Sequence, residues 1–186
     1  MQRPLNRALA VAAALALAAA TSAQAQVGLT SNTATVTLNA TKNSTLTVSP
    51  TTATATLASI TDNSNVNNFT NVGLTTAWNL TAGTSVNLVG WFTTPASALV
   101  NGTAVIPSTN VEGGINGGGF TAFTGGAVGG VGVAGGSLQL FNQAVAVANY
   151  LGTRTDQLNL RLNLVGFPTT SAGTYTGTLN VQAVVQ

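Results

Sequence analysis

Near the C-terminal end of the chain, every second residue of 158–164 is a leucine and the residues between are polar. Successive side chains of a β-strand point to opposite faces, so this pattern predicts a strand with one buried face. A second alternating stretch, 174–185, follows a loop with turn residues at both ends. Because the two apolar faces match in length, we expect the two strands to pair antiparallel. The predicted core of this pair consists of Leu158, Leu160, Leu162, Leu164, Tyr175, Leu179 and Val181.

The rest of the chain contains further short β-prone segments separated by turn residues. This spacing favours an all-β antiparallel sandwich, and no strand–helix alternation suggests a parallel α/β sheet. We expect a hairpin of 75–81 with 85–92, and a second over 98–106, where Asn101-Gly102 suits a type I′ turn. In 113–136, twelve of 24 residues are glycine, which predicts a flexible connection with one short strand at 120–123. The length suggests a single domain, 26–186.

The first 25 residues have the features of a secretory signal peptide. Arg3 and Arg7 precede an apolar run over 8–20, and Ala23-Gln24-Ala25 is a cleavage signal. The alternative is a membrane anchor, but the run is shorter than the roughly 20 residues that span a bilayer. No later stretch is long and apolar enough to span. We therefore expect a secreted protein, located in the periplasm, at the cell surface or in an extracellular fibre, with no membrane span after cleavage.

Charge is scarce in the chain. Beyond residue 25, three cations balance three acids, so the expected net charge of the mature chain is zero. Three scattered cations are too few for a nucleic-acid interface. Only 4% of all residues are charged, where about 25% is usual, and near-zero net charge promotes association. These features suit an assembled surface protein, and an extracellular monomer of low charge remains the alternative. The six charged residues are Lys42, Arg154, Arg161, Asp62, Glu112 and Asp156.

No segment carries a recognisable catalytic or metal-binding pattern. The chain has no cysteine and no histidine, which excludes thiolate and imidazole metal sites and the usual base of a nucleophilic triad. The spacing of the three acids does not suggest a glycosidase pair. Gly130–Gly135 matches a dinucleotide fingerprint but lacks the required strand and helix. Asp62–Asn67 has one carboxylate, so a solvated loop is preferred over a calcium site. We expect a non-enzymatic protein without metal or cofactor.

Both ends of the chain resemble secreted bacterial β-sandwich proteins. Ser171-Ala-Gly-Thr-Tyr-Thr-Gly-Thr-Leu179 resembles the last strand of chaperone–usher pilins and of spore-coat-U-like domains. Residues 34–40 and 44–48 resemble the start of major pilins of the alternate chaperone–usher class, which also lack cysteine. Together with Arg154-Thr155-Asp156 and the glycine-rich middle, these ends are also similar to uncharacterised secreted bacterial proteins.

This resemblance implies an immunoglobulin-like sandwich whose subunits donate an N-terminal strand to a neighbour. The donor would lie within 26–40, with Val36, Leu38 and Ala40 on its apolar face. The implied partners are further copies or related subunits, with a periplasmic chaperone as escort. The expected function is that of a structural subunit of a fimbrial surface fibre or coat. The alternative is a monomeric extracellular adhesion or carbohydrate-binding module that uses 113–136 or an exposed tryptophan.

Overall fold

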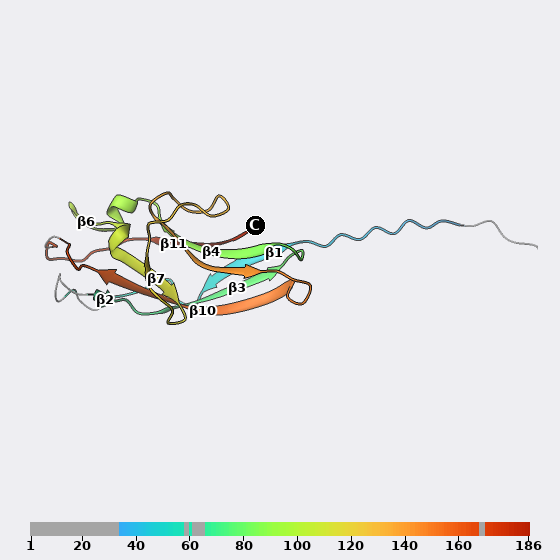
Figure 1. Ribbon diagram of the computed structural model, residues 1–186, viewed down its shortest axis with the longest axis horizontal. Helices are drawn as coiled ribbons and strands as arrows, with labels where there is room; N and C mark the ends of the chain where they lie inside the picture. Colours follow the sequence, from blue (N-terminus) through green and yellow to red (C-terminus); the bar gives the residue numbers. More distant parts are fainter. Residues whose placement is uncertain (1–33, 58–59, 61–65, 168–169) are drawn as a thin grey trace, which may run out of the picture. The chain divides into compact units, whose positions relative to one another are not determined.

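The computed structural model describes residues 34–57, 60, 66–167 and 170–186. The predicted signal peptide, residues 26–33 and Asp62 lie outside the described residues. The chain divides into two units, 1–41 and 42–186. In the first unit, the described residues 34–41 form no helix or strand and are exposed. All the strands belong to the second unit (Figure 1).

The larger sheet has six antiparallel strands. Its order is β1-β3-β10-β7-β8, and β2 pairs with the far end of β10. The longest strand, β10, pairs with β3 along its first half and with β7 along its second half. The strands are β1 (Thr45–Pro50), β2 (Val66–Asn68), β3 (Val72–Asn79), β7 (Val111–Ile115), β8 (Thr121–Ala122) and β10 (Leu151–Asn163).

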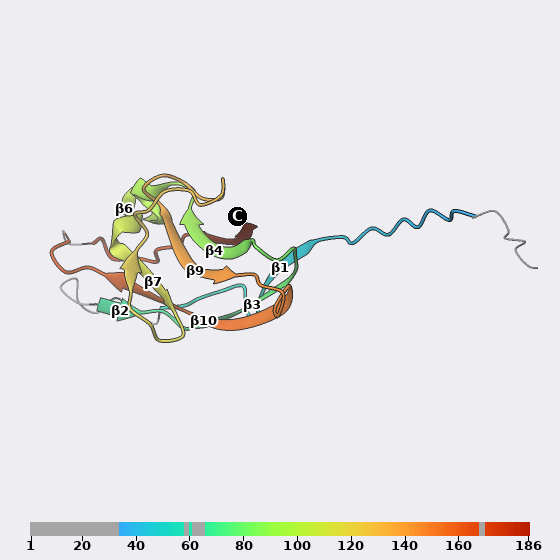
Figure 2. The same ribbon diagram turned by 45° about the vertical axis from the view of Figure 1, so that its right-hand side comes forward.

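The second sheet has three antiparallel strands in the order β11-β4-β9 and packs against the first (Figure 2). A separate hairpin, β5–β6, lies beside one end of β11, where Val100 bridges to Thr176. The prediction of an all-β antiparallel sandwich is confirmed. No helix in the described part of the chain is long and apolar enough to cross a membrane. The remaining elements are β4 (Ser85–Phe92), β5 (Leu99–Asn101), β6 (Ala104–Ile106), β9 (Ser137–Ala144), β11 (Leu179–Val185) and the 3-10 helices η1 (Pro95–Ser97) and η2 (Ser108–Asn110).

The predicted pairing of the two C-terminal strands is wrong. β10 lies in the six-stranded sheet, whereas β11 lies in the three-stranded sheet and pairs with β4. Their matched apolar faces contribute to the same core from opposite layers. Alternation reports which face of a strand is buried, and it does not report which strand is the neighbour. The leucines at 158, 160, 162 and 164 are buried, and Tyr175, Leu179 and Val181 are half-buried against the core.

The two expected hairpins have different outcomes. β3 and β4 form as strands, but the turn between them crosses from one sheet to the other, so they do not pair. β5 and β6 do pair, with Asn101 opposite Ala104. Their central turn residues are therefore Gly102 and Thr103, and only Gly102 has a positive φ, 60°. A type II′ turn places glycine at this first central position, so the expected type I′ turn is wrong.

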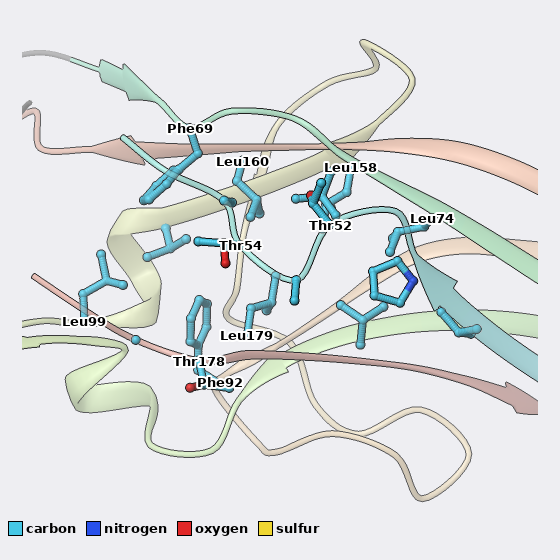
Figure 3. A pocket seen from close by; sticks show the side chains of 18 residues that line it. Thr52, Thr54, Phe69, Leu74, Phe92, Leu99, Leu158, Leu160, Thr178 and Leu179 are labelled. Carbon is cyan, nitrogen blue, oxygen red and sulfur yellow. The ribbon is translucent and has the colours of Figure 1, made fainter. Parts of the chain in front are cut away.

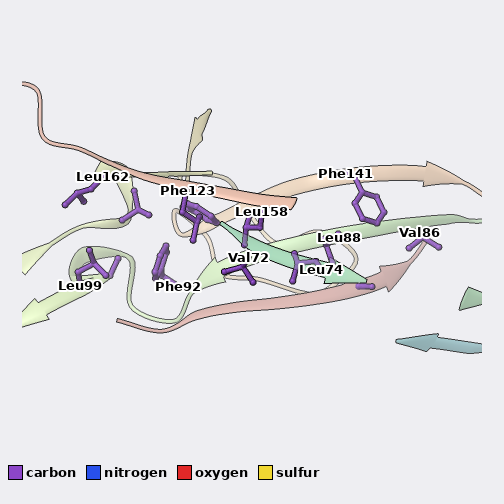
Figure 4. Close-up of a cluster of buried hydrophobic side chains, with 14 of the residues drawn as sticks. Val72, Leu74, Val86, Leu88, Phe92, Leu99, Phe123, Phe141, Leu158 and Leu162 are labelled. Atoms are coloured by element: carbon purple, nitrogen blue, oxygen red, sulfur yellow. The ribbon is translucent and has the colours of Figure 1, made fainter. Parts of the chain in front are cut away.

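The glycine-rich tract contains more strand than we expected, because its first residues belong to β7 and β8 lies within it. Its Phe123 is fully buried and packs edge-on against Phe92, with ring centroids 5.2 Å apart (Figure 4). A Cβ on Gly90 of β4 or Gly113 of β7 would lie about 3 Å from the Phe123 ring. These two glycines, one in each sheet, therefore make room for an aromatic side chain between the layers.

Candidate functional site

The sandwich has two long sides, and hydrogen bonds close one of them. On the β7–β9 side, the chain leaving β8 turns across the gap between the sheets. Gly125 N–H donates to Ser137 O at 2.7 Å, and Ser137 N–H donates to Gly125 O at 3.3 Å. Because Ser137 begins β9 and β8 pairs with β7, this connection joins the edges of the two sheets. Phe123 fills the space behind it.

The opposite side, between β1 and β11, is open, and we call it the seam. Cα atoms of β1 and β11 lie within 8 Å of each other, yet the two strands belong to different sheets and are not paired. In the described part of the chain, no hydrogen bond joins 45–57 to 177–186. A groove of about 420 Å³ enters the core here (Figure 3). Its lining is mostly apolar and includes Val48, Phe69, Leu74, Phe92, Leu99, Leu158, Leu160, Leu179 and Val181.

The backbone of β11 presents unpaired groups to the seam. Ser85 and Gln186 exchange two backbone hydrogen bonds, at 2.7 and 3.0 Å. Such pairs recur at every second residue of an antiparallel ladder, so the even residues of β11 bond to β4. The odd residues, Leu179 to Val185, then turn their N–H and C=O groups toward the seam. The side chains of these same residues pack against the core.

In β1, too, the residues whose side chains face the core are those whose backbone groups face the seam. Thr51 N–H donates to Gly73 O at 2.8 Å, which places the odd residues of β1 in hydrogen-bonded pairs with β3. Leu46 and Val48 therefore direct their backbone groups to the seam and their side chains to the core. Two sheet edges with exposed N–H and C=O groups thus border one apolar groove, and such edges are templates for pairing with a further strand.

The segment after β1 leaves the groove incompletely filled. It lines the groove and is held at Thr56, whose carbonyl accepts from Thr70 N–H at 2.7 Å. Figure 3 shows Thr52 and Thr54 crossing between the leucines of β10 and the start of β11. Residues 52–56 alternate threonine and alanine. The alanine side chains, Ala53 and Ala55, are too small to fill the space that a leucine or valine would fill.

The predicted donor residues lie in the exposed segment 34–40, which we call the donor segment. Val36 and Leu38 are 77% and 88% exposed, and Ala40 is exposed too. The donor segment is an extended chain with two apolar side chains at alternate positions and no strand partner among the described residues. The seam has free strand edges and an incompletely filled apolar groove, so the two are complementary. The seam could accept one extended strand, which would pair with an edge and insert every second side chain.

Sequence reasoning found part of this site. Leu158, Leu160, Leu179 and Val181 line the groove, whereas the other residues of the predicted pair lie elsewhere in the core. It missed the 52–55 segment and Gly177. The threonine–alanine alternation could have identified the first. Gly177 belongs to the C-terminal motif that carries the resemblance, but nothing in that motif indicates that a Cβ there would overlap the carbonyl of Ala98.

The charged and aromatic residues form no second site among the described residues. Asp156 is buried and accepts from Arg154 Nε and from Asn116 Nδ2, both at 2.6 Å. Glu112 pairs with Arg161 and accepts from Asn163 Nδ2 at 2.8 Å. In each of the two ion pairs, Arg154–Asp156 and Glu112–Arg161, the two side chains neutralise one another.

The two tryptophans differ in burial. Trp78 is buried, and its indole N–H donates to Asn149 O at 2.9 Å. Trp91 is half-buried on the outer face of β4. Trp78 is therefore not available to stack on a sugar ring, whereas part of Trp91 is exposed.

Comparisons of the chain with models of protein families, with curated proteins and with solved structures each found no match.

Proposed function

We propose that this protein is a secreted, non-enzymatic structural subunit that assembles by strand complementation into a surface fibre or coat. The donor segment of one copy fills the seam of the next, with Val36 and Leu38 in the groove. One observation carries the proposal: a single chain contains both an open apolar groove between two free strand edges and an exposed strand-like segment of matching pattern.

The energetics of exposure support this assignment. Burying apolar surface contributes about 25 cal/mol per Å², so two exposed aliphatic side chains and an open groove are both costly in water. Insertion of the donor segment would remove both costs in one step. The new strand would also pair with the free backbone groups of Leu179 to Val185.

The charge distribution supports close packing of copies. The described charged residues of the folded unit are held in two ion pairs, apart from Lys42, which lies over the Tyr150 ring at 4.2 Å. No strong field of one sign would therefore keep subunits apart.

The first experiment tests the two faces of the donor segment in the mature chain from Gln26. A Val36→Asp/Leu38→Asp variant places charges on the apolar face. A Thr35→Asp/Thr37→Asp variant places the same charges on the opposite face, which would remain in solvent after insertion. Light scattering after size exclusion, together with electron microscopy, measures assembly.

We expect a series of oligomers or filaments from the parent chain and from the threonine variant, and monomers from the Val36/Leu38 variant. A parent chain that stays monomeric at all concentrations would overturn the proposal. So would a Val36/Leu38 variant that assembles like the parent. A monomeric parent would favour the adhesion or carbohydrate-binding module, which a glycan screen would then test.

A further inference from the structure

Two patches of exposed apolar side chains lie at opposite ends of the folded unit. The first, which we call the Tyr150 patch, consists of Val147, Tyr150 and Leu151, which are 80%, 44% and 68% exposed. The second, the valine patch, comprises two exposed pairs: Val66 and Val165 near the end of β10, and Val100 opposite Val105 in the β5–β6 hairpin.

The strand β10 separates the two patches. It starts at Leu151 and ends at Asn163, which pairs with Val66. A strand of this length spans roughly 40 Å. Figure 1 shows β2 and β6 at one end of the unit and the start of β10 at the other.

The Tyr150 patch lies where the donor segment joins the folded unit. The Lys42 ammonium stacks on the Tyr150 ring and donates to Leu80 O at 3.3 Å. Leu38 precedes Lys42 by four residues, which reach about 14 Å at most. When Leu38 of one copy occupies a neighbour's seam, the Tyr150 patch must therefore lie close to that neighbour.

The position of the groove determines which end of the neighbour lies next to the Tyr150 patch. The groove is bordered by Leu99 and by Leu179 to Val181, at the end of the seam where β5 and β6 lie. A donor parallel to β11, with Leu38 beside Leu179, would place residue 42 beside Ala183. That position is still inside the seam, where the folded unit that follows cannot fit.

A donor antiparallel to β11 avoids this clash. With Leu38 beside Leu179, Val36 lies beside Val181, and residue 42 lies beside Tyr175, before β11 begins. The chain then leaves the seam at the β5–β6 end. Its folded unit emerges next to the valine patch of the neighbour.

We infer that assembled copies make a second contact, end to end, between the Tyr150 patch of one copy and the valine patch of the next. This inference rests on the proposed strand complementation and adds a surface that the donor segment does not provide. The two patches differ, so the contact is heterologous and repeats from one copy to the next; it gives an open filament where the rotation between copies does not close a ring. The partner at both patches is a further copy of this chain.

Engineered cysteines test how the donor is seated, because the chain has none of its own. In the antiparallel arrangement Asn39 lies beside Thr178, and the pair Asn39→Cys/Thr178→Cys should give a ladder of disulfide-linked multimers. Each single variant should give dimers at most. Thr41→Cys/Gln182→Cys, the pair that a parallel donor would bring together, should give no ladder.

Charges in the Tyr150 patch test the second contact. Val147→Asp/Leu151→Asp should raise the concentration needed for assembly at least tenfold, while the Asn39–Thr178 ladder still forms at high concentration. Adding Val105→Lys should recover part of the loss through charge attraction. Thr153→Asp/Thr155→Asp, on the exposed face of β10, is the matched control and should assemble like the parent.

The outcomes separate the two proposals. A cysteine ladder together with an unchanged assembly concentration in Val147→Asp/Leu151→Asp would overturn the end-to-end contact and leave strand complementation intact. A ladder from Thr41→Cys/Gln182→Cys in place of Asn39→Cys/Thr178→Cys would overturn it too, because the donor would then leave at the other end. Absence of any ladder, with a monomeric parent, would overturn both proposals.

Discussion

The indole of Trp78 lies directly over Gly152, its cross-strand neighbour. Gly152 of β10 is opposite Trp78 of β3, and a Cβ added to Gly152 would overlap the indole ring. The indole N–H is fixed by its hydrogen bond to Asn149 O, so the ring cannot swing away without losing it. The glycine thus allows a large aromatic side chain to cover the end of the core.

We expect Gly152→Ala to lower the free energy of unfolding by about 1–3 kcal/mol, the usual cost of overpacking a core. Chemical denaturation followed by tryptophan fluorescence measures it. Gly119→Ala is the matched control, because a Cβ there meets nothing within 4 Å. Equal stability of the two variants would show that Trp78 repacks freely.

Asn116 serves two purposes in the turn after β7. Its φ is 52°, a left-handed conformation, and its side chain bonds to two groups of β10. Nδ2 donates to Asp156 Oδ1 at 2.6 Å, and Oδ1 accepts from Gln157 N–H at 2.7 Å. Asparagine is one of the few residues that adopts this conformation readily.

Two substitutions at 116 separate these purposes. Asn116→Gly keeps the backbone conformation and loses both side-chain bonds, so we expect a loss of about 1–3 kcal/mol. Asn116→Ala loses the same bonds and adds roughly 1 kcal/mol of backbone strain. Thermal unfolding should rank the parent above Asn116→Gly and Asn116→Gly above Asn116→Ala. If Asn116→Ala were as stable as Asn116→Gly, the left-handed backbone conformation at residue 116 would impose no strain on an alanine.

Asp156 is a buried carboxylate of β10 that is held in place by its two hydrogen-bond partners. Asp156→Ala leaves Arg154 without its counter-ion and Asn116 without its acceptor. We expect a loss of about 2–4 kcal/mol, below the cost for a fully buried pair, because Arg154 can still reach water. Arg154→Met in the same chain removes the uncompensated charge and keeps side-chain packing over Phe141. The double variant should therefore recover part of the loss, and strictly additive losses would contradict coupling of the pair.

Alternation in the sequence predicted the inward faces of the strands but not their neighbours. The leucines of β10 and the apolar residues of β11 were placed on buried faces, as the structure has them. Their matched lengths suggested pairing, yet strands that share a core can belong to either layer. The turn before β4 has the same ambiguity, because a short link can join two strands of one sheet or cross between sheets.

The candidate site was predictable only in its donor half. Val36 and Leu38 alternate like core residues, and nothing in that pattern distinguishes a strand for its own sheet from one for a neighbour. The groove arises from distant segments, since small side chains at 52–55 face Leu179 across the seam. The closed side depends on Phe123 fitting between Gly90 and Gly113, which are separated by 23 positions. Such long-range fits leave no local signal.

A free peptide with the sequence of residues 34–41 should stabilise the Val36→Asp/Leu38→Asp variant, whose own donor segment is disabled. A ligand that binds only the folded state stabilises it by about 2.7 kcal/mol at a concentration of 100 Kd. For a chain of this size that corresponds to a rise in Tm of roughly 5–10 °C. Differential scanning fluorimetry against peptide concentration measures the shift. A peptide of the same composition that moves valine and leucine to opposite faces is the control, because only one of its apolar side chains could enter the groove. Equal rises in Tm with both peptides would mean that the seam binds a strand without requiring both apolar side chains on one face. No rise in Tm with either peptide would mean that the seam does not bind the strand.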